Sequence, residues 1–215
     1  MAQEKLLKQL DSFDNAQRRS ALGSLANIDG DFSPVGENVN MHFHSFYSFN
    51  AEGYSPSHIV YNARKKGLYA AGLCDFDVLD GLEEFITAGE LLGLRTTVNL
   101  ETRAFLSEFS DVDMNSPGEP GVTYVMGAGF AHLPETGSPQ ADKLASYRGQ
   151  ARQRNLDLIE RINKHLPQIE IDYEKHVLPL TPSGTATERH IIQAYINRAE
   201  DTFAGAALKI GRAHV

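Results

Sequence analysis

The segment Met41-His42-Phe43-His44 decides the fold predicted for this chain, because it reads as a β-strand that brings two histidines to one place. Successive side chains of a strand point to opposite faces of the sheet, so the two imidazoles point the same way. Histidine is a common ligand of zinc-like and iron-like ions, and it is also a common surface residue. The pattern therefore has two interpretations, a pair of metal ligands or two histidines of a half-exposed strand.

A loop with further oxygen atoms follows this strand. Residues 45–56, SFYSFNAEGYSP, are rich in turn-forming residues and include Asn50 and Glu52. Turn formers predict that the strand ends here, so the loop could bring oxygen ligands to the imidazoles. This layout is typical of a metal site at the carboxyl end of a strand, and Glu52 is a candidate ligand.

The composition is that of a globular protein. The chain has 215 residues, 41% of them apolar, which suffices for one domain or for one domain with an appendage. A net charge of −8 and a pI near 5.5 argue against a nucleic-acid partner bound by a broad basic face. The single cysteine, Cys74, rules out an internal disulfide and fits a reducing compartment. No apolar run reaches the length of a membrane span and the N-terminus lacks the apolar core of a signal peptide, so we expect a cytoplasmic protein without a membrane partner.

The first part of the chain predicts a helical extension over residues 1–37. Apolar residues recur at helical spacing over residues 4–25, which predicts one amphipathic helix. The basic pair Arg18-Arg19 is expected on its solvated face. The ordered domain is expected to begin at Asn38.

Two helices are predicted after the first strand. The pair Ser55-Pro56 is typical of a helix start, and this helix is expected to run to about Lys66 and to be closed by Gly67 in a left-handed conformation. A second helix is predicted over residues 80–92, with Gly93 at its end.

Buried strands that end in acidic residues alternate with these helices. Residues 68–74 predict the second strand, which is followed by Asp75 and Asp77. Those two carboxylates either lie beside the histidines or serve as helix caps and loop hydrogen-bond acceptors. Residues 96–100 predict the third strand, and Glu101 directly after it must find a partner.

Three strand–helix units in a row predict a parallel sheet, in which the polar residues that follow the strands gather at one edge. In a barrel built from such units the chemistry takes place at the carboxyl ends of the strands. The residues expected to meet there are His42, His44, Asp75, Asp77 and Glu101.

This order of blocks resembles the polymerase and histidinol phosphatase (PHP) superfamily. The similar stretch covers residues 39–105: the His-x-His strand, the serine-rich loop with its proline, NARKKGLYAAG, CDFDVLDGLEEF, and a Gly-Leu followed by NLE. Family members typically read Thr-Asp-His-Asp where this chain reads Cys74-Asp75-Phe76-Asp77. The resemblance implies an α/β fold, the N-terminal part of a distorted TIM-like (β/α)7 PHP barrel, here with an N-terminal helix and a helical insertion.

The resemblance also implies a site for divalent metal ions, with Mn, Zn or Fe as the candidates. The ligands that it implies are His42, His44 and Glu101. Phe76 stands at the position of a family ligand and cannot bind metal, so Asp75 or Asp77 is a candidate replacement. Asn50 or Glu52 is a candidate for the acidic residue after the first family motif, and Asp75 is the candidate catalytic carboxylate.

The middle of the chain predicts one more strand and a long helix. Residues 121–129 predict the strand, in which Tyr124 is nearest to the place of a family histidine. His132 is either a displaced ligand or an ordinary loop histidine. Residues 140–166 predict one long helix, or two helices broken near Gly149.

The last predicted elements are a strand or extended segment over residues 169–178 and a helix over residues 185–197. The signature Thr-x-x-Glu of Thr185–Glu188 is expected to cap that helix. Arg189 and His190 resemble an element that precedes a helix in some phosphoesterases of the family. They are candidates for a phosphate contact and for a metal ligand respectively, or they are surface residues of a capped helix.

The function that the resemblance implies is metal-dependent hydrolysis of phosphoesters, with a phosphorylated small molecule as substrate. Phe76 favours an alternative, a non-catalytic PHP-like module whose degenerate metal site serves as a scaffold or interaction domain. A third interpretation, a nucleic-acid-processing accessory domain, fits poorly with the acidic composition.

The last seven residues, KIGRAHV at 209–215, can be back-translated into a widely used sequencing-adapter sequence. We therefore expect them to be read-through, with no functional role for His214. The family has further strands and a late Asp-x-His ligand pair. We accordingly expect the PHP-like domain of residues 38–208 to be incomplete, and the native gene to continue past about Leu208.

Overall fold

The computed structural model describes residues 2–28 and 32–203. The expectations for residues 209–215, including His214, and for the continuation past Leu208 lie outside the described residues. The chain divides into two compact units, Met1–Arg148 and Gly149–Val215. Each unit is described by itself.

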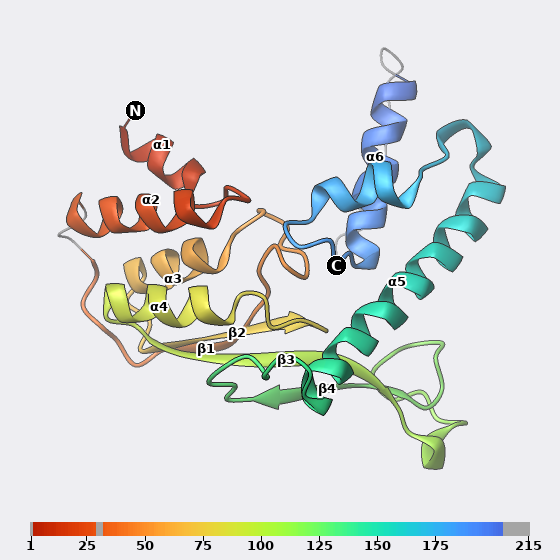
Figure 1. Ribbon diagram of the computed structural model, residues 1–215, viewed down its shortest axis with the longest axis horizontal. Coiled ribbons are helices and arrows are strands. Elements are labelled where there is room, and N and C mark those ends of the chain that lie inside the picture. Colours follow the sequence, from red (N-terminus) through yellow and green to blue (C-terminus); the bar gives the residue numbers. More distant parts are fainter. Residues whose placement is uncertain (1, 29–31, 204–215) are drawn as a thin grey trace. The chain divides into compact units, whose positions relative to one another are not determined.

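The first unit is built on a four-stranded sheet with the order β1-β2-β3-β4 (Figure 1). The first three strands are parallel and β4 pairs antiparallel with β3, so that the sheet curls into half a barrel. All four strands predicted for this unit are present, and β3 is longer than predicted. Their bounds are β1 Val39–Phe43, β2 Ala70–Phe76, β3 Arg95–Phe105 and β4 Val122–Ala128.

Two helices, α3 (Pro56–Lys65) and α4 (Leu82–Leu92), cover one face of this sheet (Figure 1). The start of α3 is as predicted: Ser55 is the N-cap, its side chain accepts a hydrogen bond from the backbone N–H of His58, and proline follows. Gly67 after α3 has a φ of 73°, and a Cβ there would stand 2.4 Å from the carbonyl oxygen of Pro34. Only glycine fits this turn, which directs the chain into β2.

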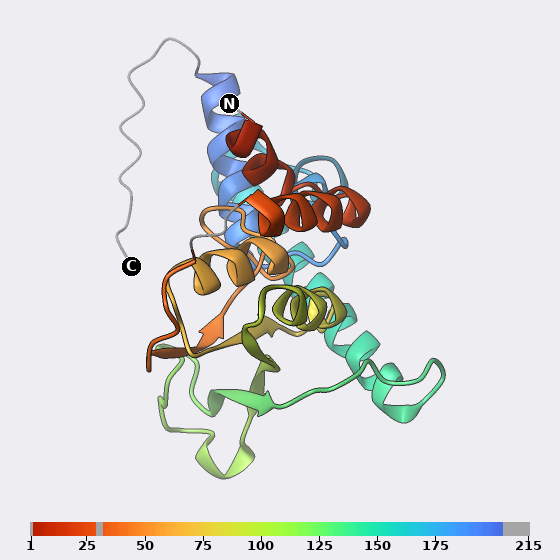
Figure 2. The ribbon, with the colours of Figure 1, turned by 90° about the vertical axis from the view of Figure 1, so that its left-hand side faces the viewer.

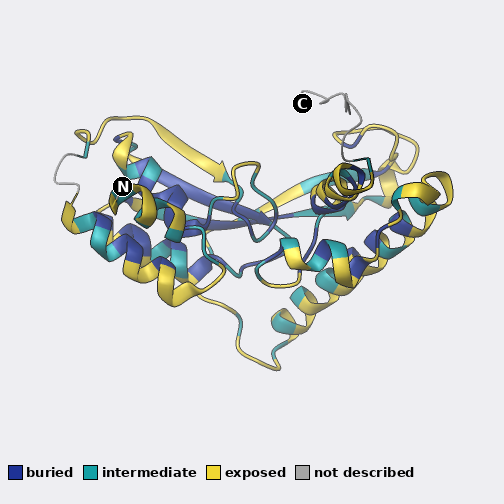
Figure 3. Cartoon of the chain, turned by 90° about the horizontal axis from the view of Figure 1, so that it is seen from above, coloured by how far each residue is buried: buried dark blue, intermediate teal, exposed yellow. Residues whose placement is uncertain are grey.

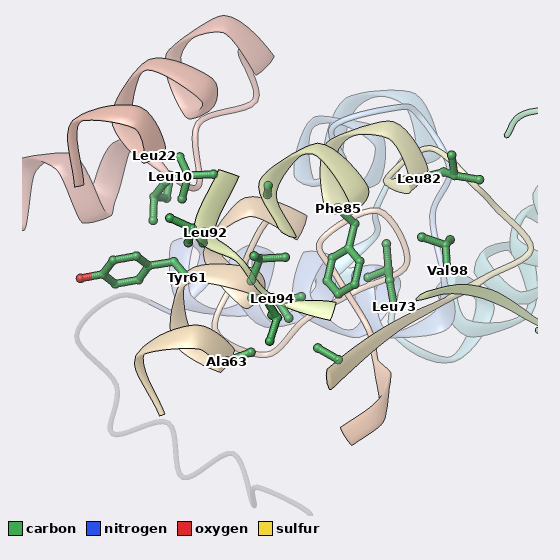
Figure 4. Close-up of a cluster of buried hydrophobic side chains, with 14 of the residues drawn as sticks. Leu10, Leu22, Tyr61, Ala63, Leu73, Leu82, Phe85, Leu92, Leu94 and Val98 are labelled. Carbon is green, nitrogen blue, oxygen red and sulfur yellow. The ribbon is translucent and has the colours of Figure 1, made fainter. Parts of the chain in front are cut away.

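The core of the first unit lies between the sheet and these helices (Figure 4). Leu73 of β2 and Val98 of β3 pack beneath Phe85 of α4, and Tyr61 of α3 belongs to the same cluster. Figure 3 shows that β2 is buried almost throughout, whereas β1 is exposed along most of its length. The side chains of β2 are therefore held by packing on both faces, as expected for a central parallel strand.

The N-terminal segment forms two helices where one was predicted. They are α1 (Ala2–Gln9) and α2 (Asn15–Ile28), and they lie above α3 and α4 (Figure 2). The break comes at Asp14, whose side chain accepts a hydrogen bond from the backbone N–H of Ala16 at 2.9 Å. This local bond competes with helix continuation, so that Asp14 starts a new helix.

The prediction of a solvated Arg18-Arg19 pair was wrong for Arg18, which is 1% exposed. Its guanidinium Nε donates to Glu84 of α4 at 2.9 Å, and its Nη1 donates to the carbonyl oxygen of Ser12 at 2.7 Å. A buried guanidinium is tolerated only when paired and hydrogen-bonded in this way. The ion pair of Arg18 and Glu84 thus joins α2 to α4, one of the two helices that cover the sheet.

Replacement of Arg18 by Ala is expected to lower the free energy of unfolding by about 3–5 kcal/mol, because it leaves the Glu84 carboxylate buried without its partner. Urea denaturation followed by circular dichroism measures the change. Arg19→Ala is the matched control, since Arg19 is exposed, and a change within about 0.5 kcal/mol is expected there. Equal losses in the two variants would show that the buried pair contributes nothing specific.

The helical insertion is one continuous helix, α5 (Pro139–His165), which does not break at Gly149. In the second unit the predicted strand over residues 169–178 is wrong. That stretch forms short helical turns instead: η2 Pro167–Ile169, η3 Tyr173–Val177 and η4 Leu178–Leu180. The Asp172 side chain accepts a hydrogen bond from the backbone N–H of Lys175 at 2.9 Å, which starts a helical turn where a strand would need an extended backbone.

The last described helix is α6 (Glu188–Thr202), and its predicted cap was wrong by two residues. Thr187 is the N-cap, and the capping box pairs it with His190, not Thr185 with Glu188. The backbone N–H of Thr187 donates to Nδ1 of His190 at 3.1 Å, so histidine takes the place that Glu or Gln usually has. The core of this unit joins the short turns to α5 and α6 through Ile159, Ile171, Tyr173, Val177, Ala186, Ile191, Ala194 and Tyr195.

Candidate metal centre

Three side chains meet as predicted, His42 and His44 at the carboxyl end of β1 and Glu101 opposite the last residue of β2, although Glu101 lies within the longer β3 and not after it. Nε2 of His42 lies 3.2 Å from Nε2 of His44 and 3.1 Å from Oε2 of Glu101, and Nε2 of His44 lies 3.2 Å from the same oxygen. Within residues 2–28 and 32–203 this is the one group of three or more potential His, Cys, Asp or Glu ligands. We call His42, His44 and Glu101 the donor triangle.

The close approach of β1 to β2 positions the two histidines. A Cβ at Gly72 would lie 2.6 to 2.8 Å from backbone atoms of Met41, so glycine is needed at this point of β2. The Asn99 side chain of β3 donates to the carbonyl oxygen of Met41 at 3.1 Å. Sequence reasoning missed Asn99, whose only signal was an amide side chain between the apolar residues Val98 and Leu100.

The donor triangle fits a divalent ion. Two nitrogens and one oxygen suit zinc, manganese or iron. Ligands at about 2.1 Å from one ion stand roughly 3.0 Å apart in octahedral geometry and roughly 3.4 Å apart in tetrahedral geometry. The observed separations of 3.1 and 3.2 Å fall between these values. Glu101 is buried and His42 is 43% exposed in its side chain, so the triangle has a protein side and a solvent side.

The second ring nitrogen of His44 is held by a serine. Nδ1 of His44 lies 3.2 Å from Oγ of Ser48, and this hydroxyl donates its hydrogen to Asp75 at 2.7 Å. A hydroxyl has one hydrogen, so Oγ of Ser48 can only accept from Nδ1–H. The proton of neutral His44 is therefore on Nδ1, so that the lone pair of Nε2 faces the other two donors and can bind a metal.

Asp75 lies beneath the donor triangle and does not join it. The carboxylate is 1% exposed and accepts from the backbone N–H of Ser45, from the Ser45 hydroxyl and from Ser48, each at 2.7 Å. Burial raises the pKa of Asp75 to about 6, against the opposing effect of the serine hydrogen bonds. Its observed contacts are those of an anchor for the loop after β1, and its predicted catalytic role remains a prediction.

The further oxygen ligands expected near the histidines are engaged elsewhere. Asp77 has a φ of 58°, and its carboxylate accepts from the Thr102 hydroxyl at 2.6 Å. Asn50 holds the loop, since its side chain donates to the carbonyl oxygen of His44 at 2.9 Å and accepts from the backbone N–H of Glu52 at 2.9 Å. Glu52 itself is exposed, and neither it nor Asp77 belongs to the donor triangle.

An aromatic wall borders the donor triangle. Phe76 pairs with Glu101 in the register of β2 and β3, and its ring stacks on His44 with centroids 5.8 Å apart and planes at 15°. Tyr124 of β4 meets Phe76 edge to face at 5.6 Å. On this side of the donor triangle, an aromatic ring occupies the place that a further metal ligand could take.

Neither a family model nor a curated protein matches the chain. Chains of solved structures do match, and two of them are described here. A predicted metal-dependent phosphoesterase from Bifidobacterium adolescentis matches with a TM-score of 0.59 and 20% identity over 85% of this chain and 59% of that one. An amidohydrolase from Chromobacterium violaceum, with bound sulfate and no metal, matches with a TM-score of 0.52 and 18% identity over 78% of this chain and 51% of that one. The chain shares its fold with part of each of these two proteins.

This chain thus spans between half and three fifths of the length of the two hydrolases. None of its described helices is long and apolar enough to cross a membrane. The likeness to a metal-dependent phosphoesterase in fold agrees with the presence of a donor triangle that fits a divalent ion.

The remaining predicted site residues lie outside the donor triangle. His132 is exposed, with Nδ1 at 3.0 Å from the carbonyl oxygen of Leu133. Arg189 and His190 belong to the second unit, where Arg189 is exposed and His190 is buried as the capping partner of Thr187. Burial lowers the pKa of His190 to about 4, so its ring is neutral at physiological pH. Their roles at the metal site remain predictions.

Replacement of Ser48 by Ala is expected to weaken metal affinity by about 10- to 100-fold, because it frees the tautomer and the ring orientation of His44. Zinc titration against a competing chelator measures the affinity. Ser57→Ala is the matched control, because the Ser57 hydroxyl also donates to a carboxylate, Glu84, at 2.7 Å, but outside the site. An unchanged metal affinity in the Ser48 variant would show that the contact of Ser48 with His44 does not contribute to metal binding.

Proposed function

We propose that this chain is a PHP-type hydrolase that uses a divalent metal ion to cleave phosphoesters of small molecules. The observation that supports the proposal is the donor triangle, which lies beside the carboxyl ends of the parallel strands β1 and β2. In barrels of strand–helix units this end holds the catalytic groups.

The residues of the site have separate tasks in this proposal. His42, His44 and Glu101 would hold the ion, which can be Mn, Zn or Fe because a mixed nitrogen and oxygen donor set does not select among them. Such an ion would supply Lewis-acid charge that activates water near neutral pH and neutralises a phosphoryl oxygen. Ser48 keeps Nε2 of His44 unprotonated, and Glu101 offers a buried negative charge to the cation.

Two further points support phosphoesters as the substrates. The order of the sequence blocks from Val39 to Phe105 resembles the PHP superfamily, and these blocks lie on β1, β2 and β3 and on the helices α3 and α4 between them. One solved protein of similar fold bears the name of a phosphoesterase, and the other holds sulfate, a tetrahedral anion like phosphate.

The proposal is tested by loading the purified chain with Mn, Zn or Fe and screening phosphomonoesters, phosphodiesters and amides. We expect metal-dependent release of phosphate or of an alcohol, abolished by a chelator and restored by the ion. Hydrolysis of amides alone would reject the phosphoester assignment, and an absence of metal binding would reject the proposal as a whole.

The double replacement of His42 and His44 by Ala is expected to abolish metal binding with little loss of fold, because the ligands at the strand ends contribute little to the core. Metal content by mass spectrometry and the thermal unfolding midpoint measure the two effects. Full metal content in the double variant would show that the ion binds elsewhere.

Phe76 supports a second candidate function, a non-catalytic PHP-like module that acts as a scaffold or interaction domain. Phe76 lies beside Glu101 in the sheet register and presents a ring without a donor atom to the site. If the chain has this second function, the donor triangle binds a metal ion weakly and the protein hydrolyses no substrate.

The replacement Phe76→His separates the two functions. It is expected to raise metal affinity by about tenfold or more, because it adds a nitrogen donor beside Glu101, an effect at least as large as that of an outer-shell partner. Phe76→Leu is the control, since it removes the aromatic ring without adding a ligand. If metal affinity and hydrolysis stay unchanged in the histidine variant, the scaffold function is favoured.

A further inference from the structure

An arginine that the function above does not use lies on the same strand face as the donor triangle. Arg103 follows Glu101 by two residues on β3, so both side chains leave the sheet on the same side. In the register of β3 and β4 it pairs with Tyr124, whose ring meets Phe76. Arg103 therefore stands next to the aromatic wall, one step further along the strand than the carboxylate ligand.

The guanidinium of Arg103 is already bound to an anion. Its partner is the carboxylate of Glu119, which also accepts a hydrogen bond from the Ser116 hydroxyl. The arginine side chain is 18% exposed, whereas that of Glu119 is 45% exposed. The carboxylate of Glu119 thus comes from an exposed loop, and the guanidinium of Arg103 comes from the sheet.

The separation along the strand is within reach of an arginine. Two residues of a strand span about 6.6 to 6.8 Å, a distance comparable to the length of an extended arginine side chain. A guanidinium presents a planar fork of donors that matches phosphate as well as carboxylate. An anion held beside Glu101 could therefore take the place of the Glu119 carboxylate.

We propose that Arg103 binds the phosphate group of the substrate, and that Glu119 occupies the arginine until the substrate displaces it. This inference rests on the proposed function for the identity of the anion. It assigns the phosphate contact to a residue on the same sheet as the donor triangle, in addition to the sequence candidate Arg189 in the second unit.

Replacement of Glu119 distinguishes two possible roles of its ion pair with Arg103. If Arg103 and Glu119 only fasten the loop to the sheet, neutralising Glu119 loosens the structure and does nothing for anion binding. If Glu119 competes with the substrate, Glu119→Gln strengthens phosphate binding while Arg103→Ala weakens it. Opposite changes in phosphate affinity on replacing Arg103 and on replacing Glu119 distinguish a substrate-binding role of the ion pair from a structural role.

The experiment titrates inorganic phosphate into the metal-loaded chain by isothermal calorimetry at low ionic strength. For Arg103→Ala we expect roughly a tenfold or greater rise in Kd, the effect of losing a charged bidentate contact. For Glu119→Gln we expect a Kd several-fold lower than that of the wild type. In turnover of a phosphomonoester, Arg103→Ala should raise KM more than it lowers kcat.

Arg95→Ala is the matched control. Arg95 lies on the same face of the same strand, at its opposite end, where its guanidinium stacks over Tyr69 at 4.2 Å. Its loss should leave the Kd for phosphate unchanged. Circular dichroism of all variants shows whether each one is folded, and Arg103→Gln, which keeps most of the side-chain length, replaces the alanine variant if that variant is unfolded.

The possible outcomes separate this inference from the proposed function. A Kd for phosphate that is equal in folded Arg103 variants and the wild type overturns the inference, and so does weaker phosphate binding by Glu119→Gln. Phosphate binding that depends on Arg103 without hydrolysis of any phosphoester supports the inference and rejects the function. Hydrolysis with an unchanged KM in the Arg103 variants supports the function and rejects the inference.

Discussion

The buried carboxylate of Asp75 is the constraint on which the geometry of the donor triangle depends. A carboxylate without contact with water must be satisfied by hydrogen bonds, and here a backbone amide and two serine hydroxyls of the loop after β1 supply them. Ser45 fixes the backbone directly after His44, and Ser48 fixes the protonated nitrogen of its ring. A residue of β2 thus sets, through Ser45 and Ser48, the orientation of a ligand that directly follows β1.

The part of the site that could be predicted from the sequence rests on local periodicity. Alternation along the strands places His42 and His44 on one face, and the carboxyl ends of parallel strands share an edge with Glu101. The cap at Ser55 and the left-handed Gly67 follow in the same way from residue type. These features need no knowledge of distant contacts, so a single sequence suffices for them.

The features that sequence reasoning missed depend on partners far apart in the chain. Nothing near Arg18 indicates that Glu84 lies beside it, and the charge pattern alone favoured a solvated face. The place of Arg103 beside the site requires the antiparallel register of β3 and β4, which residues 121–129 do not reveal by themselves. The helical turns after Asp172 arise because a side-chain hydrogen bond outweighs an apolar pattern that reads as a strand.

The surroundings of Glu101 explain why a cation should be attracted to this edge of the sheet. In the sheet register its neighbours are Phe76 on β2 and Met126 on β4, both apolar, and Glu101 itself is buried. The thiol of Cys74 is affected by the same surroundings. Burial, as the larger cause, and the charge of Glu101, as the next, raise the pKa of Cys74 to about 11. Charge interactions strengthen where water is excluded, and the imidazoles of the donor triangle carry no full charge when neutral. A divalent ion at the donor triangle would therefore gain more from Glu101 than it would from a carboxylate on an open surface.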